Sequence, residues 1–239
     1  MIKQISLIAA LTLMIGSLSA QDLKGIFNKA KAKITGEETE DVGLGLKEAL
    51  EVGVNDAVDF LSAEDGYYKS VYKILLPEEV TQVTGKLKNV PGFQNVEEDL
   101  IEKMNRAAED AAKKATPIFV NAIKQMTFKD AMNLLMGDKD AATRYLEKTT
   151  YTNLYDAFKP VIIESLDKVN AREYWRSAVT AYNKIPFTKK TNPELDDYVT
   201  KTALTGLFGE IEKKEADIRE NPAARTSDLL KKVFSKQDK

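Results

Sequence analysis

The chain has 239 residues, with 35 basic and 37 acidic side chains, and it contains neither histidine nor cysteine. Those two absences exclude Ser-His-Asp and Cys-His nucleophile pairs, zinc sites of the usual ligand types and disulfide bonds. The near-neutral charge gives no electrostatic reason to expect a nucleic-acid partner. We predict no cofactor and no metal site. Any catalysis would rest on carboxylates, Lys, Tyr, Ser or Thr, or on a hard metal ion held by oxygen atoms.

The N-terminus has the layout of a secretory signal peptide. A short basic start at residues 1–3 precedes a mostly apolar run over residues 5–18, and small residues at 17–20 supply a cleavage site. The apolar run is too short for a good membrane anchor. We therefore expect residues 1–20 to be removed and the protein to be exported to the periplasm or the cell exterior. An ordinary core helix is the alternative, but the segment lacks a polar face.

A basic amphipathic helix and an acidic linker are expected next. Lysines lie away from the apolar face of the segment 22–34, and the stretch 35–45 is acidic and contains glycine. Two interpretations of this helix are open: it docks on the body of the protein, or it makes a peripheral contact with a membrane surface. The domain prediction is therefore a signal peptide over 1–20, the helix and linker over 21–44, and an all-helical domain over 45–239.

In the body of the chain, apolar residues recur at steps of three and four, which indicates helices, and no strand-like alternation occurs. The sequence predicts an all-α, compact bundle of about nine or ten helices without a sheet. One stripe runs from Leu154 to Val169, with Pro160 expected to kink or divide its helix. The other expected helices cover residues 46–62, 77–90, 96–115, 117–126, 128–136, 171–185, 193–220 and 228–234, and one more starts after residue 138.

Several residues are typical of helix ends. Thr127 and Asp130 have the spacing of a capping box, and Ser227 suits the start of the last helix. Gly137 suits the left-handed position after a helix, and Asp138 suits the cap of the next one. Asp138 also opens an acidic run like that of a calcium loop, but the Gly and Glu that such a loop requires are missing.

One carboxylate stands in an unexpected place. Glu215 lies within the apolar stripe of the last long helix, where a buried carboxylate must be paired or protonated. Arg219, one turn later, and Arg225 are its expected partners, and such a pair would attach the C-terminal helix to the body. The alternatives are a functional acid at Glu215 and a Glu215 side chain that simply reaches solvent at the helix end.

Other polar residues are candidates for ligand binding or for structural hydrogen bonds. Asn105 flanks an apolar stripe, where it could bond to a neighbouring helix or line a cleft. Arg106 and Glu109 lie farther round the same helix and are expected in solvent. Arg144 could bind an anion or the carbonyls of a helix end. We predict no catalytic residue among them.

The segments NRAAEDAAKKATPIFVNAIKQMTFKDA (105–131), DAATRYL (140–146) and NPAARTSDLLKKVF (221–234) resemble a bacterial domain-of-unknown-function family. The members of this family are exported and helical. The resemblance covers nearly all of the chain that follows the signal segment. It implies export and an all-helical fold, and it transfers no activity, ligand or catalytic residue.

The leading hypothesis is a non-catalytic binding or interaction protein of the cell envelope, whose partner is an apolar small molecule or another envelope protein. A wide apolar cavity would favour the small molecule, and a packed core with an exposed apolar patch would favour the protein. The alternative is a carboxylate-based hydrolase or lyase, with a hard metal ion as an option. It requires two carboxylates that converge in a cleft from different helices.

Overall fold

The computed structural model describes residues 43–77, 81, 95–184, 186–187, 190–225 and 227–234. The expected signal peptide, the 22–34 helix and nearly all of the 77–90 helix lie outside these residues, and the three-part division of the chain stays a prediction. The described part of the chain contains no strand, so the predicted all-α fold is confirmed. Eight helices have both ends placed there, slightly fewer than the nine or ten expected, and a helical run over 43–62 joins them.

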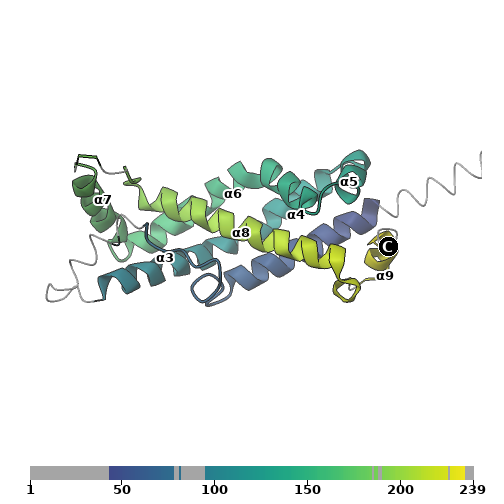
Figure 1. Ribbon diagram of the computed structural model, residues 1–239, viewed down its shortest axis with the longest axis horizontal. Coiled ribbons are helices and arrows are strands. Elements are labelled where there is room, and N and C mark those ends of the chain that lie inside the picture. The colour runs from purple at the N-terminus through teal and green to yellow at the C-terminus, as the bar shows by residue number, and fades with distance from the viewer. Residues whose placement is uncertain are drawn as a thin grey trace, which may run out of the picture.

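The helices form an elongated bundle (Figure 1). The run over 43–62, α3, α6 and α8 lie along its length, α7 stands at one end, and α5 and α9 stand at the other. The bounds are α3 (Val96–Ala112), α4 (Ala115–Gln125), α5 (Phe128–Leu135), α6 (Ala141–Asp167), α7 (Ala171–Tyr182), α8 (Leu195–Glu220), the 3-10 helix η1 (Pro222–Ala224) and α9 (Asp228–Phe234).

Helix α6 is the centre of the bundle, because it packs against α3, α4, α5, α7 and α8. Its fully buried face repeats at steps of four and eight residues, with Leu146, Leu154, Phe158, Ile162 and Leu166. Pro160 lies inside α6 and does not divide it, so that part of the prediction is wrong. Pro160 is exposed, and water can reach the carbonyl that its missing N–H leaves free.

Small residues let α3 approach its neighbours closely. The buried face of α3 ends in four alanines, Ala107, Ala108, Ala111 and Ala112, and α3 packs against both α6 and α8. Larger side chains fill the space between α4, α6 and α8. There the ring of Phe208 meets Phe119 edge-on at 5.9 Å and stacks on Tyr151 at 6.5 Å.

The helix ends agree with the sequence in some places and differ in others. The capping box is present, because the Asp130 N–H donates to Thr127 Oγ1 and the Thr127 N–H donates to the Asp130 carboxylate. Ser227 Oγ accepts from the Leu230 N–H at the start of α9. Gly137 does not adopt a left-handed conformation, and Asp138 does not cap α6, which begins at residue 141 without a local side-chain cap.

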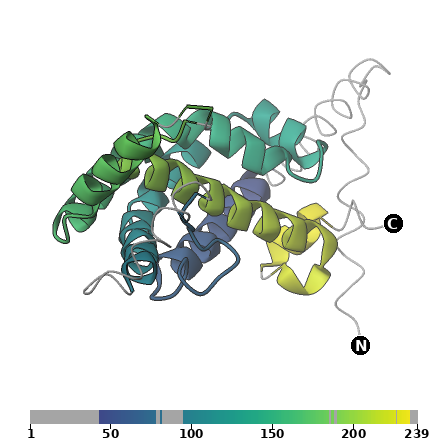
Figure 2. The same ribbon diagram turned by 60° about the vertical axis from the view of Figure 1, so that its left-hand side comes forward.

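Helices α7 and α9 lie far apart in the bundle (Figure 1 and Figure 2). Figure 2 shows α7, in green, and α9, in yellow, on opposite sides of the molecule. Among the described residues, none of the helices is both long and apolar enough to span a lipid bilayer.

Candidate functional site

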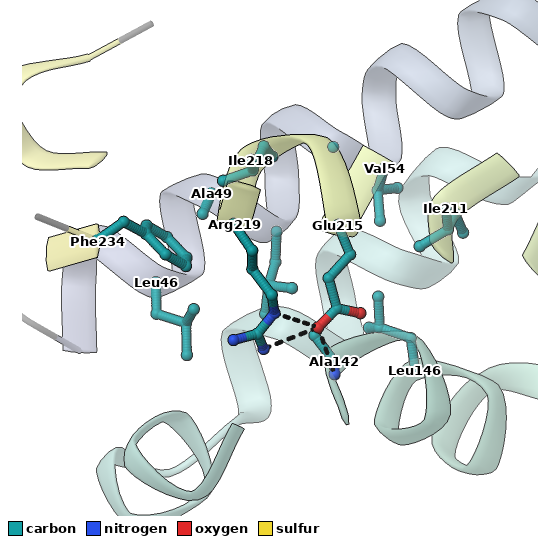
Figure 3. Close-up of a pocket in the computed structure, with 12 residues that line it drawn as sticks. Leu46, Ala49, Val54, Ala142, Leu146, Ile211, Glu215, Ile218, Arg219 and Phe234 are labelled. Carbon is teal, nitrogen blue, oxygen red and sulfur yellow. Dashed lines mark hydrogen bonds and ion pairs between the residues drawn. The ribbon is translucent and has the colours of Figure 1, made fainter. Parts of the chain in front are cut away.

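An apolar crevice lies between the 43–62 helix, α6, α8 and α9 (Figure 3). Its volume is about 30 Å³, which is room for roughly one water molecule. Glu215 and Arg219 form its polar wall. The apolar walls are Leu46, Ala49, Leu50, Gly53, Val54, Ala142, Leu146, Ile211, Ile218 and Phe234.

Glu215 closes the N-terminus of α6 from a different helix. Its carboxylate accepts the backbone N–H of Ala142 at 3.1 Å, the N–H of Thr143 at 2.8 Å and the Thr143 hydroxyl at 2.8 Å. The first N–H groups of a helix have no intrahelical partner, and they carry the positive end of its dipole. Glu215 therefore supplies, from α8, the cap that α6 does not have in its own sequence.

Arg219 performs the complementary task at the C-terminus of α5. Its guanidinium donates to the carbonyl of Leu134 at 2.8 Å and to that of Leu135 at 3.3 Å. The same group donates two hydrogen bonds to Glu215 Oε1, at 3.0 Å and 2.8 Å. The expected ion pair is thus present. The side chains of Arg219 and Glu215 are 11% and 7% exposed, so one turn of α8 fastens two helix ends at once.

Arg225 does not bind Glu215, so that expected partnership is wrong. Its guanidinium donates to the carbonyls of Ile218 and Arg219 at 3.1 Å and 3.0 Å, at the end of α8. It also lies 5.7 Å from the ring centre of Phe234. Arg225 is buried because the chain turns back through η1, and it holds α9 over the crevice.

Asn105 is fully buried, and its side chain forms hydrogen bonds with the backbone of an irregular segment, residues 63–77. Its Oδ1 accepts the N–H of Ile74 at 2.8 Å, and its Nδ2 donates to the carbonyls of Ile74 at 2.9 Å and Ile101 at 2.7 Å. The segment over residues 63–77 therefore obtains backbone hydrogen bonds from a side chain of α3.

Arg106 and Glu109 hold the other part of this segment, which corrects the expectation that both are solvated. Glu109 is buried and accepts the N–H groups of Tyr67 and Tyr68, each at 3.1 Å. Arg106 donates to Glu109 and to Asp65, each at 2.8 Å. These hydrogen bonds hold the pKa of Arg106 above its ordinary value. The position of Glu109 on α3 alone suggests exposure, but residues 63–77, from elsewhere in the chain, cover it.

Arg144 lies at the surface. Its guanidinium contacts Glu147 and Glu212, each at 2.6 Å, and Asp140 at 3.4 Å. The pair with Glu212 joins α6 to α8, and both of its side chains are roughly half exposed. Because the guanidinium of Arg144 already pairs with carboxylates, the structure does not support an anion-binding role for it.

A further polar cluster, at the start of α8, was not foreseen. Asp196 is buried and accepts from Arg172 at 3.0 Å, with Lys159 at 3.6 Å. Asp197 accepts the hydroxyl of Tyr155 at 2.6 Å. The only signal in the sequence was the acidic pair in a helix first turn, since the basic partners come from α6 and α7.

The contacts of this cluster shift the protonation of its members. The hydrogen bond to Asp197 raises the pKa of the Tyr155 hydroxyl. The hydrogen bond to Tyr155 raises the pKa of Lys159. Both groups keep their protons more firmly than usual, which is unfavourable for a base or a nucleophile near neutral pH.

Glu210 is a buried carboxylate of α8 with weaker contacts. Its nearest cations are Lys214 at 3.7 Å and Lys213 at 3.8 Å, and its Oε2 atom has no hydrogen-bond partner in the structure described. Burial and the neighbouring Glu210 charge raise the pKa of Tyr72 to about 12. A single glutamate inside a helix gave no sequence signal of its burial.

Within the described ranges, no three Asp or Glu residues gather in a way that could hold a metal ion. No curated protein and no solved structure matches the chain. Residues 36–235 match the family described as "Protein of unknown function (DUF4197)", and the resemblance to a domain-of-unknown-function family is confirmed. Because this match covers most of its length, the chain belongs to that family.

Proposed function

We propose that this protein is a non-catalytic interaction protein of the bacterial cell envelope, and that its partner is another protein. Three of the four buried carboxylates among the described residues carry the proposal, and Glu210 is the one that is not held in this way. Glu109, Asp196 and Glu215 are each paired with an arginine at hydrogen-bond distance. Carboxylates that are held in this way fasten loops and helix ends, and they have little freedom to act on a substrate.

The size of the crevice favours a protein over an apolar small molecule. A lipid-sized or drug-sized ligand needs a cavity of about 300–1,000 Å³, whereas the crevice beside Glu215 offers about 30 Å³. A second pocket of about 300 Å³ is an open groove beside α8. Charged side chains of Lys139, Lys213, Glu212 and Glu220 line it, and they do not suit an apolar ligand.

An exposed apolar surface at the α5 end suits a protein partner. Phe128, Met132 and Met136 recur at every fourth residue. Leu44 follows Gly43, where a Cβ would stand 3.0 Å from the Phe128 ring. Leu44, Phe128 and Met136 are 55%, 45% and 75% exposed, and Met132 is partly buried against the core. We call Leu44, Phe128, Met132 and Met136 the α5 face. Methionines adapt to the shape of a partner, and clustered exposed apolar residues mark contact sites.

Export is part of the proposal. It is supported by the basic start, the apolar run and the small residues of positions 1–20. The carboxylate-hydrolase hypothesis has no comparable support. In the two pockets described above, the carboxylates come from α8 alone, so neither pocket joins two carboxylates from different helices.

Site-specific photo-cross-linking in living cells tests the proposal. A photoreactive residue in place of Met136 should give one discrete adduct with a second protein, and Phe128→Ser in the same chain should abolish it. Val71 is the matched control position, because it is exposed and apolar but lies in the 63–77 segment. Cross-links only to residues 22–34 of the same chain would contradict the proposal, as would the same adducts from Val71.

A further inference from the structure

The loop between α7 and α8 stands on a closed base. The side chain of Asn183 donates to the carbonyl of Thr191 at 2.8 Å, and the Thr191 N–H donates back to Asn183 Oδ1 at 2.9 Å. The indole N–H of the buried Trp175 donates to the carbonyl of Asn192 at 3.0 Å. The two ends of the loop are therefore held together where they join the helices, at the end of the bundle opposite α5 (Figure 1).

Phe187 lies in this loop in a conformation that its side chain does not favour. It is fully exposed, and its φ of 65° is in the left-handed region. The other described residues with positive φ, Gly aside, are Asp65 and Asn170, whose side chains tolerate this region far better than a bulky ring does. A glycine or asparagine would avoid both the strain and the exposed ring. A Phe at this position points to a contact outside the chain.

The surroundings of Phe187 are basic. Lys184 and Lys190 lie on either side of it in the sequence and are both exposed, and the Lys190 ammonium also donates to the Asn183 carbonyl. The sequence from residue 183 to residue 193, NKIPFTKKTNP, contains three lysines and no acidic residue. The α5 face differs in this respect, because the acidic residues Asp138 and Asp140 follow it. The charge around Phe187 is complementary to an anionic surface.

We propose that Lys184, Phe187 and Lys190, in the loop between α7 and α8, form a membrane contact, with Phe187 in the interface of an anionic bilayer and the two lysines against lipid phosphates. A single ring on a convex tip offers far less area than the roughly 1,000 Å² of a specific protein interface. An aromatic ring beside lysines is the arrangement that anchors proteins at the headgroup level of a bilayer. This contact goes beyond the proposed function, and its failure would leave the α5 face untouched.

Vesicle flotation tests this inference, with the protein purified in the form that a bacterial host produces. The protein should float with vesicles that contain about one-third phosphatidylglycerol, and binding should fall several-fold between about 0.05 M and 0.3 M salt. Phe187→Ser should weaken binding about tenfold. The double variant K184Q/K190Q should lose most of the salt dependence. Phe187→Trp should keep the binding and shift its fluorescence to the blue on vesicles.

Matched controls separate this loop from other apolar and basic residues. Met136→Ser removes an exposed apolar side chain at the opposite end, and K103Q/K139Q removes two exposed lysines elsewhere, so both should bind like the unchanged protein. The inference is overturned if Phe187→Ser binds as well as the unchanged chain, or if the unchanged chain does not float. Loss of binding only on deletion of residues 22–34 would assign the contact to that segment instead.

Discussion

Glu215 shows how one residue can replace a cap that the local sequence lacks. The N-cap residue of α6, Asp140, makes no side-chain hydrogen bond to the helix. Glu215 takes its place from α8, and Arg219 neutralises the carboxylate while it binds the end of α5. Because both side chains are almost fully buried, neither charge can be removed without leaving the other uncompensated.

We predict that Glu215→Ala lowers the free energy of unfolding by about 3–5 kcal/mol, since it leaves the buried guanidinium of Arg219 without its counter-ion and the N–H groups of Ala142 and Thr143 without partners. Urea denaturation followed by circular dichroism measures this loss. Glu212→Ala is the matched control on the same helix, because its pair with Arg144 is equally short but half exposed. That variant should cost less than about 1 kcal/mol. Equal losses in the two variants would contradict the account.

Asp197 connects the polar cluster at the start of α8 to pH. Burial alone would raise the pKa of its carboxyl, but hydrogen bonds from Tyr155 and Lys201 outweigh that effect and lower it. A carboxyl whose pKa is lower in the folded state takes up its proton first in the unfolded state as the pH falls. Its stabilising effect is therefore present above about pH 4 and is lost as the pH drops through the folded pKa.

The prediction is that Asp197→Asn unfolds more easily than the unchanged protein at pH 7, and that the gap shrinks below about pH 4. Urea denaturation of the two proteins at pH 7 and at a pH below about 4 measures the difference in the free energy of unfolding. A gap that stays constant between these pH values would show that the Asp197 charge is not responsible.

At the scale of the helices, two glycines of different surroundings distinguish the effect of helix propensity on stability from the effect of packing. A Cβ on Gly53 would stand 3.5 Å from Ile218 and 3.8 Å from Lys214, which is ordinary contact at the edge of the crevice. A Cβ on Gly206 would stand 3.0 Å from the Tyr67 ring. That ring cannot move away easily, because it is buried and its hydroxyl donates to the Ala203 carbonyl at 2.8 Å.

We predict that Gly53→Ala raises the free energy of unfolding by about 0.5–1 kcal/mol, because alanine favours a helix and its methyl group has room. Gly206→Ala should lower it by about 1–3 kcal/mol through the clash with Tyr67. Thermal and urea unfolding of the two variants measure the pair. Destabilisation by Gly53→Ala would mean that the crevice is tighter than described.

The sequence predicts the helices better than it predicts their ends and their polar contacts. Apolar periodicity located the body of α8, because a core-facing stripe repeats with the helix, and Asn192-Pro193 placed its start to within two residues. Glu215 and Arg219 could be paired from their spacing, since residues four apart on a helix are neighbours. Their bonds to α5 and α6, and those of Glu109 to Tyr67, join residues far apart in the chain. Local sequence patterns cannot predict contacts between residues so far apart in the chain.

At the scale of the whole molecule, the described interior is filled by helix faces, and its apolar crevice holds no more than about one water molecule. The surfaces that we propose for contacts lie at the two ends of the bundle (Figure 1): the α5 face for a protein, and the loop with Phe187 for lipid phosphates. An elongated bundle with a contact at each end is suited to link a partner to a membrane surface.

Native mass spectrometry of the protein, purified gently from the envelope fraction of its own cells, tests the central claim most directly. The account predicts a discrete complex with a second protein, which Phe128→Ser dissolves, and a subunit mass without any releasable small molecule. A small-molecule adduct that leaves on denaturation would contradict the account, because it would require a ligand cavity that the packed crevice does not provide.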